Sequence, residues 1–262
     1  MEHITSRQNP LYKQARKLAG SARERHKTGQ IVMDGTRLIG AYAEQFGLKN
    51  CTLLVSSQDA QRPDIQQIVE ADSAQHAYLL ADALFADIAQ VATSEGIVAI
   101  AATPTVASKT PDDFRVLLEG IQDPGNLGGL LRTAAAAGAT SADLTRGCAD
   151  AWSPKSLRGG MGAQFVLRVR EHTSLAASLA DFQGTVIGTS ARAEQTIYDI
   201  DLSGPVMMMF GNEGRGLPDE VLSLAHQLVH IPMAGRMESL NVAAAAAICC
   251  FEKLRQTRVP RR

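Results

Sequence analysis

The segment 230-HIPMAGRMESLNVAAAAAI-248 places a hydrophobic strand, a loop and an Ala-rich helix in direct succession. Where the loop ends, Ser239 is a candidate N-cap, because its hydroxyl can accept a hydrogen bond from a free N–H of the first helical turn. Asn241 is then expected to face the loop. Turns that carry uncharged amides between regular elements are frequent locations of functional sites, so this segment predicts one.

Two further segments have the same construction. In 122-QDPGNLGGLLRTAAAAGA-139, the helix after the turn presents free N–H groups and Arg132, which together could hold an anion. In 208-MMFGNEGRGLPDE-220, glycines on both sides of Glu213 let the backbone approach a ligand closely. All three loops follow strand candidates, and loops at the carboxyl ends of parallel strands converge on one pocket.

The chain of 262 residues is long enough for two domains, and the Pro-bearing segment 102-ATPTVASKTPDD-113 is the predicted linker. We therefore predict domains at 1–105 and 106–262. Helices and strands alternate in both, which predicts two α/β domains, the second with a mostly parallel sheet. In the first, the expected helices are 10–26 and 36–46, and the expected strands 31–33, 52–57, 76–80 and 97–102. In the second, the expected strands are 115–121, 142–147, 164–170, 185–190, 205–211 and 227–233, and the expected helices 127–138, 173–182, 218–225 and 240–256.

Composition excludes several classes of protein. The four cysteines show no C-x-x-C spacing, so we expect reduced, buried thiols and no metal site. The sequence has neither an N-terminal apolar core of a signal peptide nor an uninterrupted apolar run of about 18 residues. We therefore expect a soluble cytoplasmic protein without a membrane span.

Positive charge is distributed unevenly, although the formal net charge is only -1. Basic residues gather near both ends of the chain and could hold a polyanion, but a solvated helix face and a frayed tail would have the same composition. They are Arg7, Lys13, Arg16, Lys17, Arg23, Arg25 and Lys27 at the start, and Arg255, Arg258, Arg261 and Arg262 at the end.

Taken singly, each of the three segments could serve only helix capping and close packing. Together and in this order, they resemble the SpoU/TrmH family of RNA ribose 2'-O-methyltransferases in the SPOUT superfamily. Its motif N-x-G-x-x-x-R-x-A is matched by Asn126, Gly128, Arg132 and Ala134. Its motif G-x-E-G-x-G is matched by Gly211, Glu213, Gly214 and Gly216, and its motif I-P-M-x-G-x-x-x-S-L-N-V by Ile231, Pro232, Met233, Gly235, Ser239, Leu240, Asn241 and Val242.

The resemblance covers about 114–256, and 155-KSLRGGMGAQFVLRV-169 also looks like the family's segment between its first two motifs. It implies a methyltransferase domain with a deep trefoil knot, in a homodimer. The N-terminal half is similar to the small L30e-like α/β domain that precedes many such enzymes, on the opening Ile4 to Pro10 and on 34-DGTRL-38. Members often have Glu where this chain has Asp34, which keeps the charge on a shorter side chain.

The chemistry that the resemblance implies is transfer of a methyl group from S-adenosylmethionine to a ribose 2'-hydroxyl. The implied catalytic residues are Asn126, Arg132, Glu213, Ser239 and Asn241, and the implied cofactor-binding residues are Gly211, Ile231, Met233 and Leu240. Arg132 would be the base or, since its pKa is above about 12, would hold a phosphate and stabilise developing negative charge. Asn126 would position ribose or Arg132, and Glu213 would orient Arg132 or the loop.

The expected RNA-binding residues are Arg7, Lys13, Arg16, Lys17 and Arg37. Ribosomal RNA is favoured as the substrate, because L30e-like modules bind folded RNA elements. Transfer RNA, an enzyme that methylates a base nitrogen, and a non-catalytic RNA-binding or ribosome-assembly factor remain as alternatives.

Overall fold

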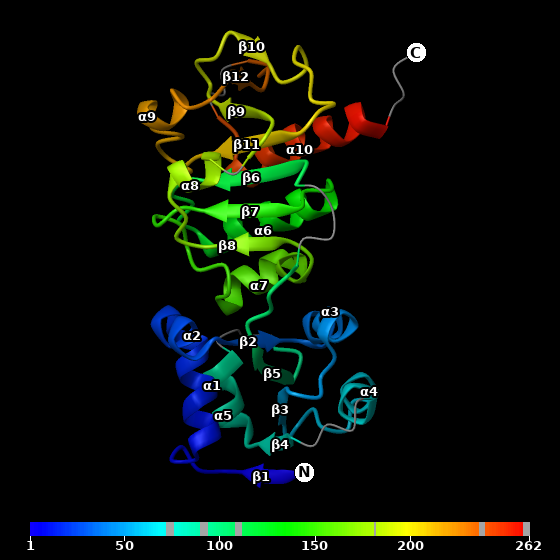
Figure 1. Cartoon of the computed structure of the whole chain (residues 1–262). Helices are drawn as coiled ribbons and strands as arrows, with labels where there is room; N and C mark the ends of the chain where they lie inside the picture. Colours follow the sequence, from blue (N-terminus) through cyan, green and yellow to red (C-terminus); the bar gives the residue numbers. More distant parts are fainter. Residues whose placement is uncertain (72–75, 90–93, 108–111, 181, 236–238, 259–262) are drawn as a thin grey trace. The chain divides into compact units, whose positions relative to one another are not determined.

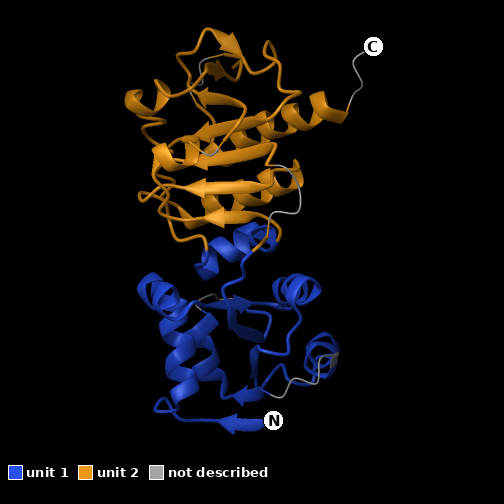
Figure 2. Ribbon diagram, in the orientation of Figure 1, with its two compact units in different colours: residues 1–105, 152–165 blue, residues 106–151, 166–262 orange. Residues whose placement is uncertain are grey.

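The computed structural model describes residues 1–262 with the exception of 72–75, 90–93, 108–111, 181, 236–238 and 259–262. The chain forms two compact units, unit 1 of residues 1–105 and 152–165, and unit 2 of residues 106–151 and 166–262 (Figure 2). The predicted domains differ from these units by the segment 152–165, which joins unit 1. That the chain folds as domains 1–105 and 106–262 stays a prediction.

Unit 1 is built on a five-stranded mixed sheet of order β1-β4-β3-β5-β2. Strands β1, β4 and β3 run parallel, whereas β5 is antiparallel to both β3 and β2. In Figure 1, α1 and α5 lie on one side of this sheet and α3 and α4 on the other. The elements are β1 (Glu2–Ile4), α1 (Pro10–Gly20), α2 (Ala22–Thr28), β2 (Gln30–Asp34), α3 (Thr36–Phe46), β3 (Thr52–Ser56), α4 (Pro63–Ala71), β4 (Ala77–Leu80), α5 (Asp82–Ala89), β5 (Ile97–Ala102), α7 (Pro154–Gly160) and a 3₁₀ turn (Ala163–Phe165).

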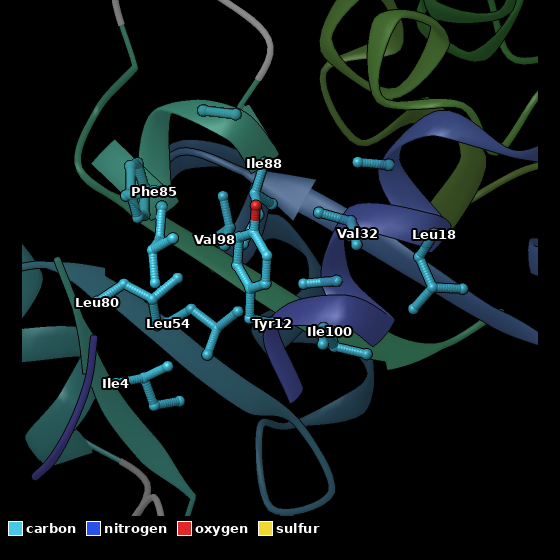
Figure 3. Close-up of a cluster of buried hydrophobic side chains, with 14 residues drawn as sticks. Ile4, Tyr12, Leu18, Val32, Leu54, Leu80, Phe85, Ile88, Val98 and Ile100 are labelled. Atoms are coloured by element: carbon cyan, nitrogen blue, oxygen red, sulfur yellow. The ribbon is translucent and has the colours of Figure 1, made fainter. Parts of the chain in front are cut away.

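Helix α1 is amphipathic. Its buried face presents Tyr12, Ala15 and Leu18 to a core that contains Leu54 and Val98 of the sheet (Figure 3). The spacing of three residues repeats the helical period, so the opposite face is left to polar side chains. The Tyr12 hydroxyl donates a hydrogen bond to the carboxylate of Asp87 at 2.8 Å. The sequence of α1 therefore fixes one apolar face and one basic face.

The predicted helix 10–26 is wrong in one respect, because it is two helices. Ser21 has extended backbone angles, and its Oγ accepts a hydrogen bond from the Glu24 N–H at 3.2 Å, which begins α2. Arg25 is also not part of an exposed basic surface, since it is 5% exposed and donates to the carbonyls of Leu18 and Ala19. Carbonyls at the end of a helix have no intrahelical donor, and Arg25 supplies one. The short elements β1, α4 and α5 were not predicted.

The segment 152–165 packs into unit 1 through both apolar and charged contacts. Phe165 is 2% exposed and meets the ring of Tyr42 edge-on at 5.3 Å between centroids. The Arg158 guanidinium lies 3.4 Å from the carboxylate of Asp34, at the end of β2. Burial, the largest influence, raises the pKa of Asp34, although the hydroxyl of Ser94 and the charge of Arg158 oppose it. This segment is therefore a structural part of unit 1.

Unit 2 contains a seven-stranded sheet of order β10-β12-β9-β11-β6-β7-β8, in which all the strand pairs are parallel. The parallel α/β fold predicted for this half is thus confirmed. The missed strand, β10, has only two residues, and the predicted strand 164–170 begins four residues later. The elements are β6 (Phe114–Leu118), α6 (Pro124–Ala136), β7 (Ser141–Leu144), β8 (Arg168–Arg170), α8 (Leu175–Ala180), β9 (Thr185–Thr189), β10 (Gln195–Thr196), β11 (Val206–Phe210), α9 (Asp219–Leu222), β12 (Gln227–His230) and α10 (Val242–Arg258).

The Ala-rich start of α10 packs against α6 within the same chain. A Cβ built on Gly129 of α6 would lie 3.7 Å from the Cβ of Ala243, which is ordinary van der Waals contact. Small residues on both helices therefore let them approach closely. No helix among the described residues combines the length and the apolar character needed to cross a membrane.

An ionic cluster extends across β6, β7 and β8, from Asp112 just before β6 to Asp143 in β7 and Arg170 at the end of β8. Arg115 is 1% exposed, and its guanidinium contacts Asp112 at 2.5 Å and Asp143 at 3.4 Å. Asp143 is itself fully buried and also binds Arg170 at 2.6 Å. Arg168 pairs with Asp112 as well. Each buried charge therefore has a partner of opposite sign, as burial of a charge requires.

Candidate active site

The three loops singled out in the sequence leave the carboxyl ends of β6, β11 and β12. Because all strand pairs in this sheet are parallel, these ends lie at one edge. The first loop leads from β6 to α6, the second follows β11, and the third leads from β12 to α10. Residues 236–238 of the third loop lie outside the described residues. The expected convergence of the loops is what the hydrogen bonds show.

A chain of side-chain hydrogen bonds joins the three loops. The Asn241 Nδ2 donates to the Asn126 Oδ1 at 3.0 Å, and the Asn126 Nδ2 donates to the Glu213 Oε1 at 3.1 Å. Each amide uses its donor and its acceptor on different partners, because the Asn241 Oδ1 accepts from the N–H groups of Ala243 and Ala244. We call Asn241, Asn126 and Glu213 the amide chain. It fixes the third loop to the first and the first to the second.

Glu213 is the negative end of this chain. Besides the bond from Asn126, it accepts from the N–H groups of Asp123 at 3.3 Å and Gln122 at 3.4 Å. Burial acts to raise the pKa of Glu213, but these hydrogen bonds outweigh it and hold the pKa below its usual value of 4.5. Glu213 is therefore ionised at neutral pH. Of its two expected roles, its contacts match the orientation of the loop and not that of Arg132.

Arg132 lies on α6 and is exposed. Among the residues that the structure describes, none makes a hydrogen bond or an ion pair with its guanidinium. An exposed guanidinium with no protein anion beside it keeps its five donors for a ligand. This is the state expected of a residue that meets an anionic substrate.

The prediction that Ser239 caps the last helix is wrong. Helix α10 begins at Val242, so Asn241 occupies the N-cap position, and its Oδ1 binds the N–H groups of the first turn. Asn is as good an N-cap as Ser, so residue preference alone does not decide between the two positions. Ser239 is exposed and lines the cavity described next.

A cavity of about 450 Å³ opens beside the third loop. Three of the four predicted cofactor residues line it, namely Ile231, Met233 and Leu240. The structure adds residues that the sequence gave no signal for, from the end of β9, from β12 and from α10. They are Thr189, Ser190, Ala191, Val229, His230, Ala245 and Cys249.

Gly211, the fourth predicted cofactor residue, is not among the residues that line this cavity. Its lack of a side chain has a packing reason, because a Cβ there would lie 2.2 Å from the backbone carbon of Gly216. The loop is closed further by Asn212, whose Oδ1 accepts from the N–H of Gly214 and whose Nδ2 donates to the carbonyl of Gly120. Asn212 was missed by the sequence reading, although Asn after a strand and before glycines is a common signal of a turn.

The predicted RNA-binding residues fall into two places on unit 1. Arg7, Lys13, Arg16 and Lys17 line one hollow of about 460 Å³ beside Tyr12. Arg7 is paired with Asp87 at 2.9 Å but its side chain is 65% exposed. Arg37 lies apart from them and lines a second hollow of about 360 Å³, whose walls include Asp34 and Arg158. The structure thus brings four of the five together.

An all-parallel α/β sheet with convergent loops and a cavity at its carboxyl edge is typical of the class of α/β proteins that bind a ligand at that edge. Residues 113–251 match the model of the SpoU rRNA Methylase family. An uncharacterized tRNA/rRNA methyltransferase of Synechocystis is 37% identical over 97% of this chain and 93% of its own length. The chain therefore belongs to the SpoU family of RNA methyltransferases, as its motifs predicted.

Two further comparisons cover almost the whole chain. The 23S rRNA (guanosine(2553)-2'-O)-methyltransferase of Bacillus subtilis is 30% identical over 96% of this chain and 98% of its own length. The crystal structure of an AdoMet-bound rRNA methyltransferase from Sinorhizobium meliloti is similar with a TM-score of 0.82, at 26% identity and over 97% of both chains. The similarity thus extends through the N-terminal unit as well as the methyltransferase motifs.

Proposed function

We propose that this protein transfers a methyl group from S-adenosylmethionine to a ribose 2'-hydroxyl of ribosomal RNA in the cytoplasm. The observation that carries the proposal is the amide chain, which joins all three family motifs beside a ligand-sized cavity. Support for ribose and for ribosomal RNA comes from the name of the Bacillus subtilis relative. Transfer RNA is the second candidate substrate, since the Synechocystis relative is named for both RNAs.

The residues present fit S-adenosylmethionine. The cavity volume is within the usual range for small-molecule sites, and Ile231, Met233 and Leu240 give it the apolar walls that such sites have. Among the described residues, the His230 Nδ1 is buried without a hydrogen-bond partner in the same wall, as a site awaiting a polar ligand would leave it. When bound, S-adenosylmethionine supplies a methyl group activated by a sulfonium sulfur.

A ribose hydroxyl is a weak nucleophile at neutral pH, so the protein must stabilise the charge that develops on its oxygen. We assign this task to Arg132, whose guanidinium has no protein anion to neutralise it. Its high pKa makes proton removal by Arg132 unfavourable, whereas its donors suit a phosphate or a developing alkoxide. Ser239 would contact the substrate end of the cavity. Arg132 would thus act through charge and position.

The amide chain would serve as the frame for this chemistry. Asn126 and Asn241 make hydrogen bonds with each other, with Glu213 and with the first turn of α10. These bonds restrict the movement of the first and third loops. Such preorganisation costs nothing at the moment of reaction, because the groups already stand where the transition state needs them. We therefore treat Glu213 as a positioning residue.

The basic hollow on unit 1 is the proposed surface for the RNA backbone. Its cationic residues lie on the exposed face of α1 and at the preceding turn, and phosphate binding by such residues depends steeply on salt. Replacement of Arg16 and Lys17 by Glu should weaken RNA binding and flatten its salt dependence, whereas Lys49→Glu, an exposed change in the same unit, should do neither. Unchanged binding by the double variant would remove this surface from the proposal.

The remaining family features, a trefoil knot, an L30e-like first domain and a homodimer, stay predictions. For the dimer, an apolar side chain of unit 2 that is exposed in the single chain offers support, namely Phe251 at 47% exposure. Sedimentation equilibrium of the full chain should then give twice the mass of 28.0 kDa.

The test of the function is methylation of purified RNA. Full-length protein, labelled S-adenosylmethionine and unmodified ribosomal or transfer RNA should give one 2'-O-methylated nucleotide, mapped by resistance to alkaline cleavage. Arg132→Ala should lose activity by about 10²–10³-fold, the cost of one transition-state donor, and keep cofactor affinity. The control Arg255→Ala removes an exposed arginine that pairs with Glu252 on its own helix. Cofactor binding without any RNA methylation would favour the non-catalytic binding factor.

A further inference from the structure

We propose that His230 binds the adenosine half of S-adenosylmethionine through a ring nitrogen and so sets cofactor affinity; this inference rests on the proposed function. His230 ends β12 and lines the cavity with Ile231, Met233 and Leu240. It was not among the residues that the sequence singled out. Its role would be that of a cofactor-binding side chain in a pocket otherwise walled mainly by apolar groups.

The first argument is the unmet hydrogen-bonding capacity of the ring. The Nδ1 is buried and has no partner, and no described residue makes a hydrogen bond with the other ring nitrogen either. A buried polar atom left without a partner costs free energy, and native structures leave few of them. A ligand in the cavity is therefore the natural partner, reached by rotation of the ring about its side-chain bonds.

The second argument is that the polar side chains contributed by the end of β9 already make hydrogen bonds. The Thr189 Oγ1 donates to the carbonyl of Met209 at 2.9 Å, and the Ser190 Oγ accepts from the N–H of Arg192 at 3.3 Å. Asp199 follows β10, the strand that pairs with β12, and its carboxylate binds the N–H and the hydroxyl of Thr196. Compared with these three side chains, the imidazole has the clearest spare hydrogen-bonding capacity.

The third argument places the contact on the adenosine half. One part of the cavity wall comes from α10, where Ala245 and Cys249 contribute small apolar surfaces. Burial raises the pKa of Cys249 to about 12, so its Sγ is an uncharged thiol at neutral pH. Apolar walls suit a purine ring, whose edge carries both acceptors and a donor. An imidazole, which carries one of each, can pair with that edge.

The test is calorimetry on the full chain with S-adenosylhomocysteine and with methylthioadenosine, which keeps the adenosine and lacks the amino-acid group. His230→Phe keeps an aromatic ring and removes both nitrogens. We expect it to weaken both ligands by about 5–10-fold, the equivalent of one hydrogen bond. His230→Gln, which restores a donor and an acceptor, should recover part of the affinity.

The matched control is Leu228→Ala, a change of an exposed side chain in the same strand that does not line the cavity. It should leave both affinities unchanged, and an equal loss there would mean that the strand and not the ring is responsible. Unchanged binding by His230→Phe would overturn the inference, and so would a loss restricted to S-adenosylhomocysteine, since the contact would then be to the amino-acid group. Failure of the unaltered protein to bind either ligand would instead refute the proposed cofactor. If His230→Phe does not fold, His230→Gln against His230→Ala gives the same comparison.

Discussion

Polar side chains are arranged differently at the amino ends and at the carboxyl ends of the strands of the seven-stranded sheet, which we call its amino edge and its carboxyl edge. From the amino edge inward, the buried side chains of Arg115 and Asp143 and the half-buried side chain of Asp112 form an ionic cluster. At the carboxyl edge, neutral amides and one carboxylate, Glu213, form a chain that remains largely exposed. The buried charges have protein partners, whereas the guanidinium of Arg132 at the other edge has none among the described residues.

This difference separates structure from function within one sheet. A buried charge must be neutralised by the protein itself, and the ionic cluster supplies its own counter-charges. Exposed polar contacts contribute little to stability. The amides can nevertheless hold the loops in place, and they do not neutralise the positive charge of Arg132. Substitutions at the two edges should therefore affect different measurements.

The largest effect is expected from Arg115→Ala. It leaves the buried carboxylate of Asp143 and the half-buried carboxylate of Asp112 with less positive charge beside them, and should lower the free energy of unfolding by about 3–5 kcal/mol. Denaturant unfolding followed by circular dichroism measures this. Arg255→Ala, whose side chain is 61% exposed, should change the stability by less than about 1 kcal/mol. Equal effects of the two changes would refute the role assigned to the cluster.

A smaller loss should follow Gly211→Ala at the carboxyl edge. The added Cβ would meet the backbone of Gly216 and Leu217, which cannot yield as a side chain can, so the loop must shift. Overpacking of this kind costs about 1–3 kcal/mol. Thermal unfolding should show it, while Gly204→Ala, where a Cβ would meet nothing within 4 Å, should be neutral. If Gly211→Ala is as stable as the control, the loop is looser than its contacts imply.

Glu213→Gln should affect activity more than stability. The glutamine has an NH₂ group where Glu213 has an acceptor oxygen, and this group would face the donors of Asn126, Gln122 and Asp123. The hydrogen bonds that hold the loops together are therefore weakened. We expect a loss of about 1–2 kcal/mol in transition-state stabilisation, roughly 5–30-fold in kcat/KM. Steady-state methylation assays measure it, with Glu220→Gln on α9 as an exposed control. A large fall in melting temperature without loss of kcat/KM would reverse the assignment.

The smallest effect concerns acid stability. Burial acts to raise the pKa of Asp112, but hydrogen bonds from Thr140, Ser141 and Arg115 outweigh it and hold the pKa below 3.8. A lowered folded pKa stabilises the protein fully above the ordinary value and is lost as the pH falls through the lowered one. Unfolding midpoints measured against pH should therefore show that ionised Asp112 stabilises the protein down to about pH 4, and that this stabilisation is lost at lower pH. Asp112→Asn should remove that acid-side part of the profile; an unchanged profile would contradict it.

Hydrophobic runs predicted the strands of the sheet well because β6, β11 and β12 are flanked by clear turn residues. Sequence patterns failed where pairing alone defines an element, as in the two residues of β10. They also failed at the start of α10, where Ser239 and Asn241 are equally good caps and only the backbone decides between them. His230 carried no signal at all, because its importance depends on a cavity formed by residues distant in the sequence.

The segment 152–165 has a consequence for modular engineering of this enzyme. The chain interrupts unit 2 after Ala151, contributes Leu157 and Phe165 to unit 1, and re-enters unit 2 at Val166. A catalytic fragment that begins at residue 106 would therefore expose the apolar side chains of 152–165, because the rest of unit 1, against which they pack, would be missing. The two halves are therefore not independent modules that can be exchanged at a single junction. A chimaera with a different N-terminal half must also carry the segment 152–165 that matches that half.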